Sequence, residues 1–342
     1  MKTKSMPGAL LQPRSLRHSL RHSLRHSLRH SLRHALWPTG PREVRPALAN
    51  CSVLVLASPS AAWAQGAGGT LPANTLPLLR GVVSGQAVVN RPAPGADRSL
   101  MTINQGSARA ILDWRSFNVS RDSEVQFIHP SSTASTLNRI YDADPSVIQG
   151  KLFSTGPVVN GQVTAGGQII LINQNGILFD RGSQVNVQSL VASTLNVRNS
   201  LFLSGALTSG GLTSAAFEGG YDAAGNTLPA RPDGTRPGVI GIGSFGAADL
   251  AAPRISANAG GSVVLVAPRI DNAGGIITAP DGQVILAAGS KAYLAVNTDN
   301  SDLTLRGLVV EVEAHKEGTG LNLTNLVRNA GEITAVTNQF VN

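Results

Sequence analysis

The stretch of sequence that decides the fold is QIILINQNGILFDRGSQVNVQSLVAST, which spans residues 168–194. It begins with an unbroken apolar run at 169–172, long enough for one fully buried strand. Residues 173–176 (NQNG) then predict a turn, because Asn and Gly tolerate positive φ better than other residues. A second apolar run follows at 177–179. We therefore expect two short strands joined by a sharp corner.

Strict alternation of apolar and polar residues follows this corner. Val185 and Val187 are apolar, whereas Gln184, Asn186 and Gln188 are polar. A period of two predicts a strand whose valines face a core and whose amides face solvent. The stretch contains no plausible nucleophile and no cluster of metal ligands.

A repeat appears further along the chain. Residues 262–267 (SVVLVA) are echoed by 283–288 (QVILAA), an offset of 283 − 262 = 21 residues. The tripeptide ITA at 277–279 recurs at 333–335, and Asn-Ala-Gly begins at 258, 272 and 329. A period near 21 suits one three-strand coil of a β-helix. Leucine-rich repeats have periods of about 20–29 residues, but their L-x-x-L-x-L spacing and helical half are missing.

The net charge of +8 is concentrated at the N-terminus. Residues 1–64 hold 10 of the 28 Lys and Arg but only one acid, Glu43. The remainder carries 28 − 10 = 18 basic and 20 − 1 = 19 acidic residues, a net charge of −1. The body of the chain therefore shows no electrostatic signature of nucleic-acid binding.

The only cysteine, Cys51, lies in the same N-terminal segment. Once that segment is removed, disulfides, Cys-ligated zinc and thiol catalysis are excluded. We expect the stability of the mature chain to come from a continuous packed core. Trp114, Phe117 and Phe127 are candidates for that core, or for the cap at one end of it.

Residues 1–64 read as an extended signal peptide, about twice the usual length. Five tandem SLRH units span 15–34 and suit a metal-binding or pH-sensing tract, a basic amphipathic face, or an expanded repeat in a tolerant n-region. We favour the expanded repeat. The apolar segment near 47–57 is too short to span a bilayer. Ala62-Trp63-Ala64 is an A-x-A cleavage site before Gln65.

Seven short motifs occur in a fixed order along residues 102–194. They are TINQ at 102–105, DWRSFNV at 113–119, VQF at 125–127, LNRI at 137–140, PSVIQG at 145–150, NQNGILF at 173–179 and LVAST at 190–194. In this order they resemble the secretion domain of the filamentous-haemagglutinin-like exoproteins, which are exported by two-partner secretion. The resemblance covers about residues 79–205, with looser similarity of the repeats beyond.

The resemblance implies an all-β fold, a right-handed parallel β-helix with an N-terminal strand cap and extra-helical hairpins. It also implies a partner, an outer-membrane transporter barrel with periplasmic domains. The secretion motif Asn-Pro-Asn-Gly-Ile of the family falls on Asn173, Gln174, Asn175, Gly176 and Ile177. Gln174 replaces proline, so we expect a less rigid corner, exposed for recognition.

The sequence predicts four regions. These are an extended signal at 1–64, the two-partner secretion (haemagglutination activity) domain at 65–208, a Gly/Pro-rich loop or linker at 209–238, and a β-helix repeat region at 239–342 that ends within a repeat and so reads as truncated. We expect residues 79–130 to cap the first coil and residues 153–167 to form an insertion or an extra-helical hairpin.

Candidate catalytic residues are sparse. We interpret His129 as a loop residue at the end of a strand, and nothing links it or His315 to a Ser/Asp pair. Glu311 and Glu313 would suit a glycosidase carboxylate pair, but alternate positions on one strand face predict solvated acids. We expect Asp142 and Asp144 to favour a turn before Pro145, and Asp281-Gly282 to form a turn. No catalytic, cofactor-binding or metal-binding residues are assigned.

These patterns predict a non-enzymatic exoprotein that passes through Sec and the periplasm to the surface of a Gram-negative bacterium or beyond. Its β-helix would serve as an adhesin or haemagglutinin scaffold for a host-cell receptor or glycan. A carbohydrate-active parallel β-helix enzyme is the alternative from another class. An autotransporter passenger is the third, although no barrel-like set of strands ends the sequence.

Overall fold

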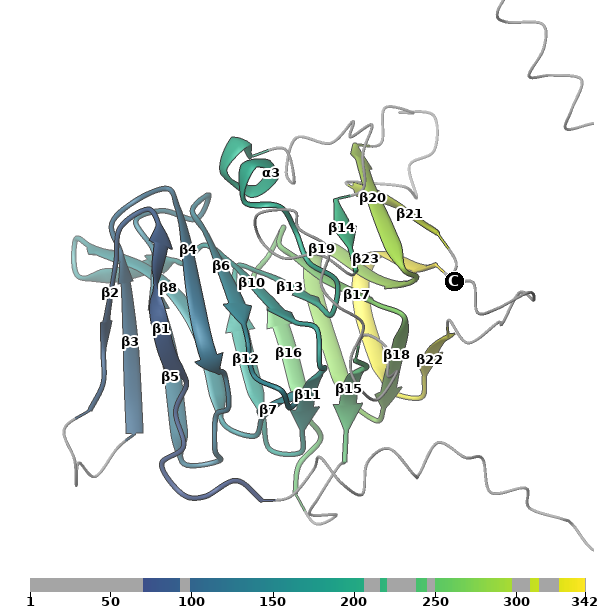
Figure 1. The fold of residues 1–342 in the computed structure, drawn as a ribbon, viewed down its shortest axis with the longest axis horizontal. Helices are drawn as coiled ribbons and strands as arrows, with labels where there is room; N and C mark the ends of the chain where they lie inside the picture. The colour runs from purple at the N-terminus through teal and green to yellow at the C-terminus, as the bar shows by residue number, and fades with distance from the viewer. Residues whose placement is uncertain are drawn as a thin grey trace, which may run out of the picture. The chain divides into compact units, whose positions relative to one another are not determined.

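The chain winds into coils, and the strands of successive coils stack on three faces (Figure 1). This architecture comes from a computed structural model, which describes residues 70–92, 99–205, 216–219, 238–244, 250–296, 308–313 and 326–341. The predicted fold class, a parallel β-helix, is confirmed. The predicted signal, with Ala62, Ala64 and Gln65, lies outside the described residues, as does His315.

Each face is a stack of parallel strands taken from successive coils. Face 1 contains β3 (Ser99–Gln105), β5 (Ser123–Ile128), β8 (Lys151–Val159), β12 (Gln184–Val187) and β16 (Arg254–Ala257). Face 2 contains β4 (Arg109–Ser116), β6 (Ser135–Ile140), β10 (Gln168–Asn173), β13 (Ser189–Ser193) and β17 (Ser262–Ala267). Face 3 contains β7 (Ser146–Ile148), β11 (Ile177–Asp180), β15 (Ile240–Gly243), β18 (Arg269–Ala273) and β22 (Leu326–Asn329). The long strands β19 (Ile276–Ala288) and β23 (Glu332–Val341) each run along face 1 and then face 2.

The sequence repeat is the strand register. Val264 pairs with Ile285 and Ala267 with Ala288, at the predicted offset of 21 residues. The ITA tripeptides also stack, Ile277 on Ile333. Of the three Asn-Ala-Gly repeats, those at 272 and 329 stack on face 3, where Asn272 Nδ2 donates to Asn329 Oδ1 at 2.7 Å. Equivalent residues therefore recur because they occupy equivalent positions in successive coils.

Two antiparallel strands cap the first coil. β1 (Leu78–Ser84) pairs with β4, and β2 (Ala87–Asn90) pairs with β3. The cap is shorter than the predicted 79–130, since residues 99–128 already form the first coil and the start of the second. The antiparallel strands cover the end of both stacks, where unpaired backbone groups would otherwise invite another chain.

The interior of the helix is a continuous apolar core. Trp114, Phe117 and Phe127 are fully buried in it, as predicted. The Trp114 and Phe117 rings meet edge to face, 5.1 Å between centroids at 87°. Trp114 Nε1 donates to Asn138 Oδ1 at 3.0 Å, so the indole N–H is satisfied inside the core.

A second apolar core lies outside face 2. Ile170 and Ile172 point outward from β10 and are nevertheless buried, whereas Ile169 and Leu171 point into the helix. On β12 of face 1, by contrast, Gln184 and Asn186 are exposed while Val185 and Val187 are buried. This difference explains the two patterns of the opening stretch. A strand buried on both sides is continuously apolar, and a strand buried on one side alternates.

Three excursions from the coils carry the remaining elements. β9 (Gln162–Ala165) folds back on β8 as a hairpin, which confirms the extra-helical hairpin predicted at 153–167. If the coils are counted by their face 1 strands, coils 1 to 4 begin at β3, β5, β8 and β12. Helix α3 (Asn199–Ser204) and β14 (Phe217–Glu218) leave coil 4 after β13, and β20 (Lys291–Val296) and β21 (Leu308–Glu313) leave the coil formed by β19. β14, β20 and β21 form an antiparallel sheet that, with α3, lies along one side of the helix (Figure 1).

The segment predicted as a Gly/Pro-rich loop or linker, 209–238, contains β14. Within this segment the structure describes 216–219 and 238, and Ala216 and Phe217 are fully buried in the second core. β15 then rejoins face 3 directly on β11. The β-helix is therefore continuous from one side of this segment to the other. Among the described residues, no helix has the length and apolar character needed to cross a bilayer.

Substitutions at outward positions should separate the two faces. Ile170→Lys on β10 should lower the free energy of unfolding by several kcal/mol, because it buries an unpaired ammonium group in the second core. Asn186→Lys on β12 points into solvent and should change it by less than about 0.5 kcal/mol. Urea denaturation followed by circular dichroism measures both. Equal losses would show that face 2 is not covered in solution.

Candidate functional site

The predicted secretion motif, residues 173–177, forms the corner between β10 on face 2 and β11 on face 3. Asn173 is the last residue of β10 and is fully buried. Its Nδ2 donates to the Asp144 carbonyl at 3.1 Å and to Ser146 Oγ at 3.0 Å, both in the corner of the preceding coil. The Asn173 side chain therefore joins two successive corners.

The same asparagine also builds the turn. Its Oδ1 accepts the Asn175 N–H at 2.9 Å, and its carbonyl accepts the Gly176 N–H at 3.1 Å. Gly176 has φ of 127°, which L side chains rarely adopt. A Cβ there would also lie 3.1 Å from the Val239 carbonyl. Asn and Gly thus hold this corner through side-chain bonding and backbone freedom.

Backbone and side-chain contacts place the corner between those of the coils before and after it. On the preceding side, the Ser146 N–H donates to the Gly176 carbonyl at 3.0 Å, and Asn175 Nδ2 donates to the Asp142 carbonyl. On the following side, the Ile177 N–H donates to the Val239 carbonyl at 3.1 Å. The partners of the corner in the next coil lie past the 209–238 segment, so the local sequence could not reveal them.

The motif is less exposed than the sequence suggested. Asn173, Gly176 and Ile177 are buried, and only Gln174 and Asn175 remain partly accessible. The expectation of an exposed corner is therefore wrong for three of its five residues, because the neighbouring coils cover them. Asp142 and Asp144, predicted only as turn formers, also accept hydrogen bonds from this corner through their carbonyls.

Comparison with known proteins identifies the family. The family model described as the TPS secretion domain matches residues 80–339. The chain belongs to the TPS secretion domain family. The match spans the cap, the coils and all three excursions, and makes this chain the secretion domain of a two-partner secretion exoprotein.

Two curated relatives share this similarity, and both are named heme/hemopexin-binding protein. One from Haemophilus influenzae is 39% identical over 94 residues, covering 28% of this chain and 9% of the relative. One from Haemophilus influenzae strain ATCC 51907 / DSM 11121 / KW20 / Rd is 34% identical over 122 residues, covering 36% and 12%. The matched region is thus about a tenth of each relative. Among solved structures, the HMW1 secretion domain from Haemophilus influenzae superposes with a TM-score of 0.48 at 23% identity, covering 69% of this chain and 50% of that one.

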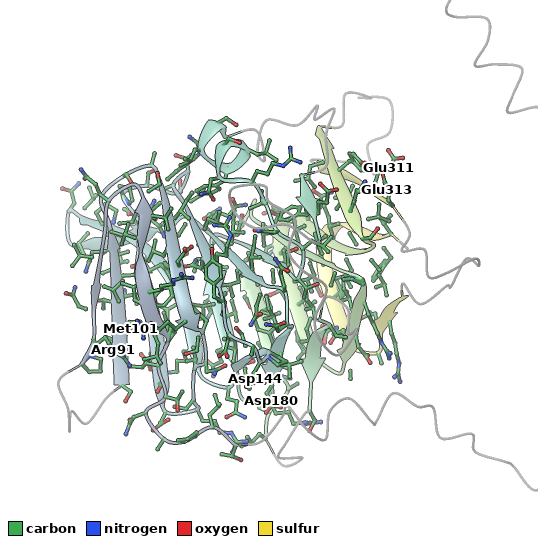
Figure 2. All side chains as sticks on the ribbon, in the orientation of Figure 1. Arg91, Met101, Asp144, Asp180, Glu311 and Glu313 are labelled. Atoms are coloured by element: carbon green, nitrogen blue, oxygen red, sulfur yellow. The ribbon has the colours of Figure 1, made fainter. Side chains whose placement is uncertain are left out.

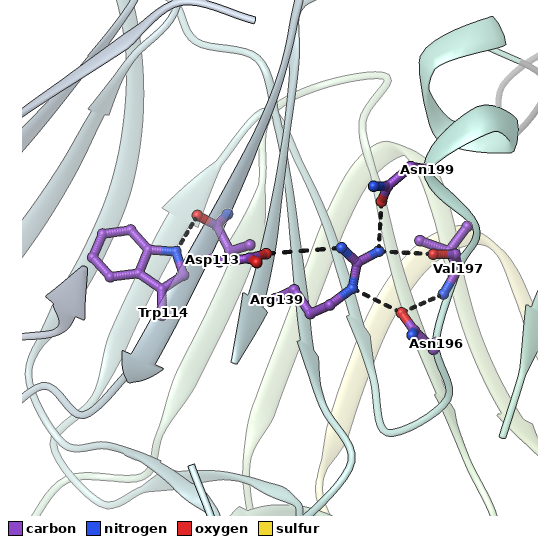
Figure 3. Close-up of polar contacts among 7 residues, drawn as sticks. Asp113, Trp114, Arg139, Asn196, Val197 and Asn199 are labelled. Atoms are coloured by element: carbon purple, nitrogen blue, oxygen red, sulfur yellow. Dashed lines mark hydrogen bonds and ion pairs between the residues drawn. The ribbon is translucent and has the colours of Figure 1, made fainter. Parts of the chain in front are cut away.

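A buried arginine ties the TPS domain's second coil to its fourth (Figure 3). Arg139 on β6 donates from Nε to Asn196 Oδ1 at 3.0 Å. Its Nη2 donates to the Val197 carbonyl at 2.8 Å and to Asn199 Oδ1 at 3.0 Å. Arg139 therefore holds the segment that leads into α3. The helix in turn contacts the first coil, because Arg109 Nη1 on β4 donates to the carbonyl of Leu203 in α3 at 3.4 Å.

Asp113 on β4 supplies the counter-charge to this arginine. Its Oδ1 lies 3.8 Å from Arg139 Nη1, an ion pair without a hydrogen bond. Burial raises the pKa of Asp113, and the Arg139 guanidinium opposes that rise. Both residues belong to motifs that carried the family resemblance, but no sequence pattern indicated this network, because the hydrogen-bond acceptors of Arg139 lie 57 to 60 residues away from it.

His129 is a loop residue at the end of a strand, as predicted, but its side chain is buried. It follows β5 directly, is fully buried and stacks on Phe127 with 5.9 Å between ring centroids. Its Nε2 lies 2.9 Å from Thr136 Oγ1. Burial lowers the pKa of His129 to about 4. The strand alternation of residues 123–128 continues through residue 129, and that signal could have placed it inside.

The acidic residues of β21 lie at the surface, as predicted (Figure 2). Glu313 pairs with Lys291 Nζ at 3.2 Å and accepts a hydrogen bond from Tyr293 Oη at 2.5 Å. Its neighbour Glu311 is exposed. Within the described part of the chain, no three His, Cys, Asp or Glu side chains gather into a metal-ligand set.

Removing the buried cation should destabilise the domain. Arg139→Met leaves Asp113 and three acceptors without their partner, and we expect a loss of about 3–5 kcal/mol in urea denaturation. The double variant Arg139→Met/Asp113→Asn should recover part of it, because no charge is then left buried. A single-variant cost below about 1 kcal/mol would contradict the burial of this pair.

His129 should make folding sensitive to acid. The pKa is about 4 in the folded chain and near 6.5 when unfolded, so the unfolded chain takes up the proton first as pH falls. Stability from this residue is therefore present above pH 6.5 and lost between pH 6.5 and 4. From pH 7.5 to 5.0, the wild type should lose about 2 kcal/mol more than His129→Gln, which does not titrate. Identical pH profiles for the two proteins would show that folding does not lower the pKa of His129.

Proposed function

We propose that this domain directs export of the chain through an outer-membrane transporter barrel whose periplasmic domains recognise residues 173–177. The observation that carries the proposal is the match of the TPS secretion domain family to residues 80–339. In this proposal the signal at 1–64 takes the chain through Sec to the periplasm and is cleaved after Ala64. The transporter then moves the chain across the outer membrane, and the β-helix folds outside.

Burial of the motif supports recognition before folding is complete. Asn173 and Gly176 are covered by the corners of the preceding and following coils once the helix has formed. Their side-chain and backbone groups are free to bind a partner only while those coils are unformed. The sequence after Cys51 holds no cysteine, so no disulfide opposes passage as an extended chain.

The folded β-helix is proposed as an adhesive scaffold for a host-cell receptor or glycan. Face 1 presents polar side chains outward, among them Gln184 and Asn186, which are exposed. The names of the curated relatives refer to heme and hemopexin, but the similarity spans only 9% and 12% of their lengths. We therefore do not extend those ligands to this chain.

The enzymatic alternative has no observation in its favour among the described residues. The acids of β21 are exposed, and Glu313 is already engaged by Lys291 and Tyr293. His129, the one described histidine, is enclosed between Phe127 and Thr136. The non-enzymatic role remains the proposal that this arrangement supports best.

Two asparagines allow recognition to be separated from stability. Asn173 and Asn272 are both fully buried, and both cross-link corners of the helix through their side-chain amides. Asn173→Ala and Asn272→Ala should each cost about 1–3 kcal/mol of stability. In cells that also make the transporter, Asn173→Ala should reduce the protein in the medium by about tenfold and raise it in the periplasm. Asn272→Ala should be exported like the wild type.

A second variant strengthens this test. Asn175 and Gly176 replaced together by bulky residues should leave the protein in the periplasm, as judged by immunoblots of the two fractions. Unchanged export of this variant, or equal loss of export for the two alanine variants, would remove residues 173–177 from the recognition step. The family assignment would be unaffected.

A further inference from the structure

The hairpin β8–β9 is built by a two-residue turn at Asn160 and Gly161. Their φ values of 51° and 77° are both positive, as a type I′ turn requires. Val159 pairs with Gln162 beside the turn, and Val158 pairs with Val163 one step further. Since hydrogen-bonded and non-hydrogen-bonded pairs alternate from the turn, the Val163 N–H faces away from β8.

This hairpin presents an apolar surface and a free strand edge. Val158 is 65% exposed and Val163 is 62% exposed, and the two are cross-strand neighbours on one face. Neither belongs to the interior core or to the second core. β9 pairs with β8 alone among the described strands. The hairpin therefore contributes little to the packed helix, while natural proteins usually blunt an edge of this kind with charges.

The pairing of this hairpin is the most local in the described chain. Its strands join residues 155–165, whereas the coils pair residues that are 21 or more positions apart. A hairpin with a two-residue turn forms within about 1–10 μs. It can thus form in a chain whose coils are not yet assembled, although a two-stranded hairpin alone is only marginally stable in water. A third strand added to β9 would stabilise it.

The charge of this segment indicates which strand would fit. No Asp, Glu, Lys or Arg occurs from 152 to 179, a run of 179 − 152 + 1 = 28 residues that contains both the hairpin and residues 173–177. A charged strand placed against β9 would lose hydration without gaining a counter-ion. An uncharged, apolar strand would pair its backbone with the edge and cover Val158 and Val163.

We propose that the free edge of β9 is the docking strand for the transporter, and that an uncharged strand of its periplasmic domain adds to this edge before the coils close. The proposal rests on the proposed function. It assigns the hairpin a role that the β-helix itself does not require, and it places the docking strand a few residues ahead of the motif corner in the order of export.

The test uses the full chain and the purified periplasmic domain of its partner transporter. Val163→Pro removes the N–H that faces the free edge and leaves the bonds between β8 and β9 in place, since edge strands tolerate proline. Val163→Glu places a charge on the same edge. Both variants should weaken binding in titration calorimetry at least tenfold and reduce export to a similar extent. The melting temperature of each variant should equal that of the wild type.

Val88→Glu is the matched control. Val88 lies on the cap strand β2 and is 61% exposed. The Val88→Glu substitution therefore places the same charge on a different edge strand. Binding within twofold of the wild type for this variant, together with loss for both Val163 variants, supports the proposal. Wild-type binding by the Val163 variants overturns it, as does a change in self-association by sedimentation without a change in transporter binding. Failure of the wild type to leave the cell with its transporter would instead refute the proposed function.

Discussion

Each coil of this domain depends on the backbone of its neighbour. The strands of one face make their hydrogen bonds with the coil before and the coil after, in parallel and mostly without a register shift. A slip of one residue would turn every apolar side chain of a strand outward. Corners with fixed geometry prevent the slip, and the buried amides of Asn173 and Asn272 bond across the coils at those corners. The apolar core is therefore ordered by polar groups at its edges.

The second constraint is the unequal cover of the faces. Face 2 is buried on both sides, and the segments that cover it arrive after the strands they protect. Phe202 and Phe217 follow coil 4, and Val310 follows the coil formed by β19. Until those segments are in place, the outer isoleucines and valines of face 2 are exposed to water. The excursions are thus part of the hydrophobic core, although their sequences are rich in Gly and polar residues.

Sequence patterns predicted what is periodic. The offset of 21 residues became the register of β17 on β19, and the two patterns in residues 168–188 became strands with covered and open faces. Patterns failed where a partner is distant. The Arg139 contacts to Asn196 and Asn199, and the cover of Gly176 by Val239, join residues separated by 57 to 63 positions. The end of the strand before His129 was predicted correctly, but the burial of its side chain beside Thr136 was not.

Arg139 in coil 2 limits how short a fragment of this domain can be and still fold. Its guanidinium is enclosed, and three of its acceptors are supplied by residues 196–199. A fragment that stops before residue 196 keeps the cation and lacks all three acceptors, so it cannot bury β6 without a large electrostatic penalty. The shortest fragment that can fold must include the last hydrogen-bond acceptor of Arg139. It therefore runs at least to Asn199, the first residue of α3.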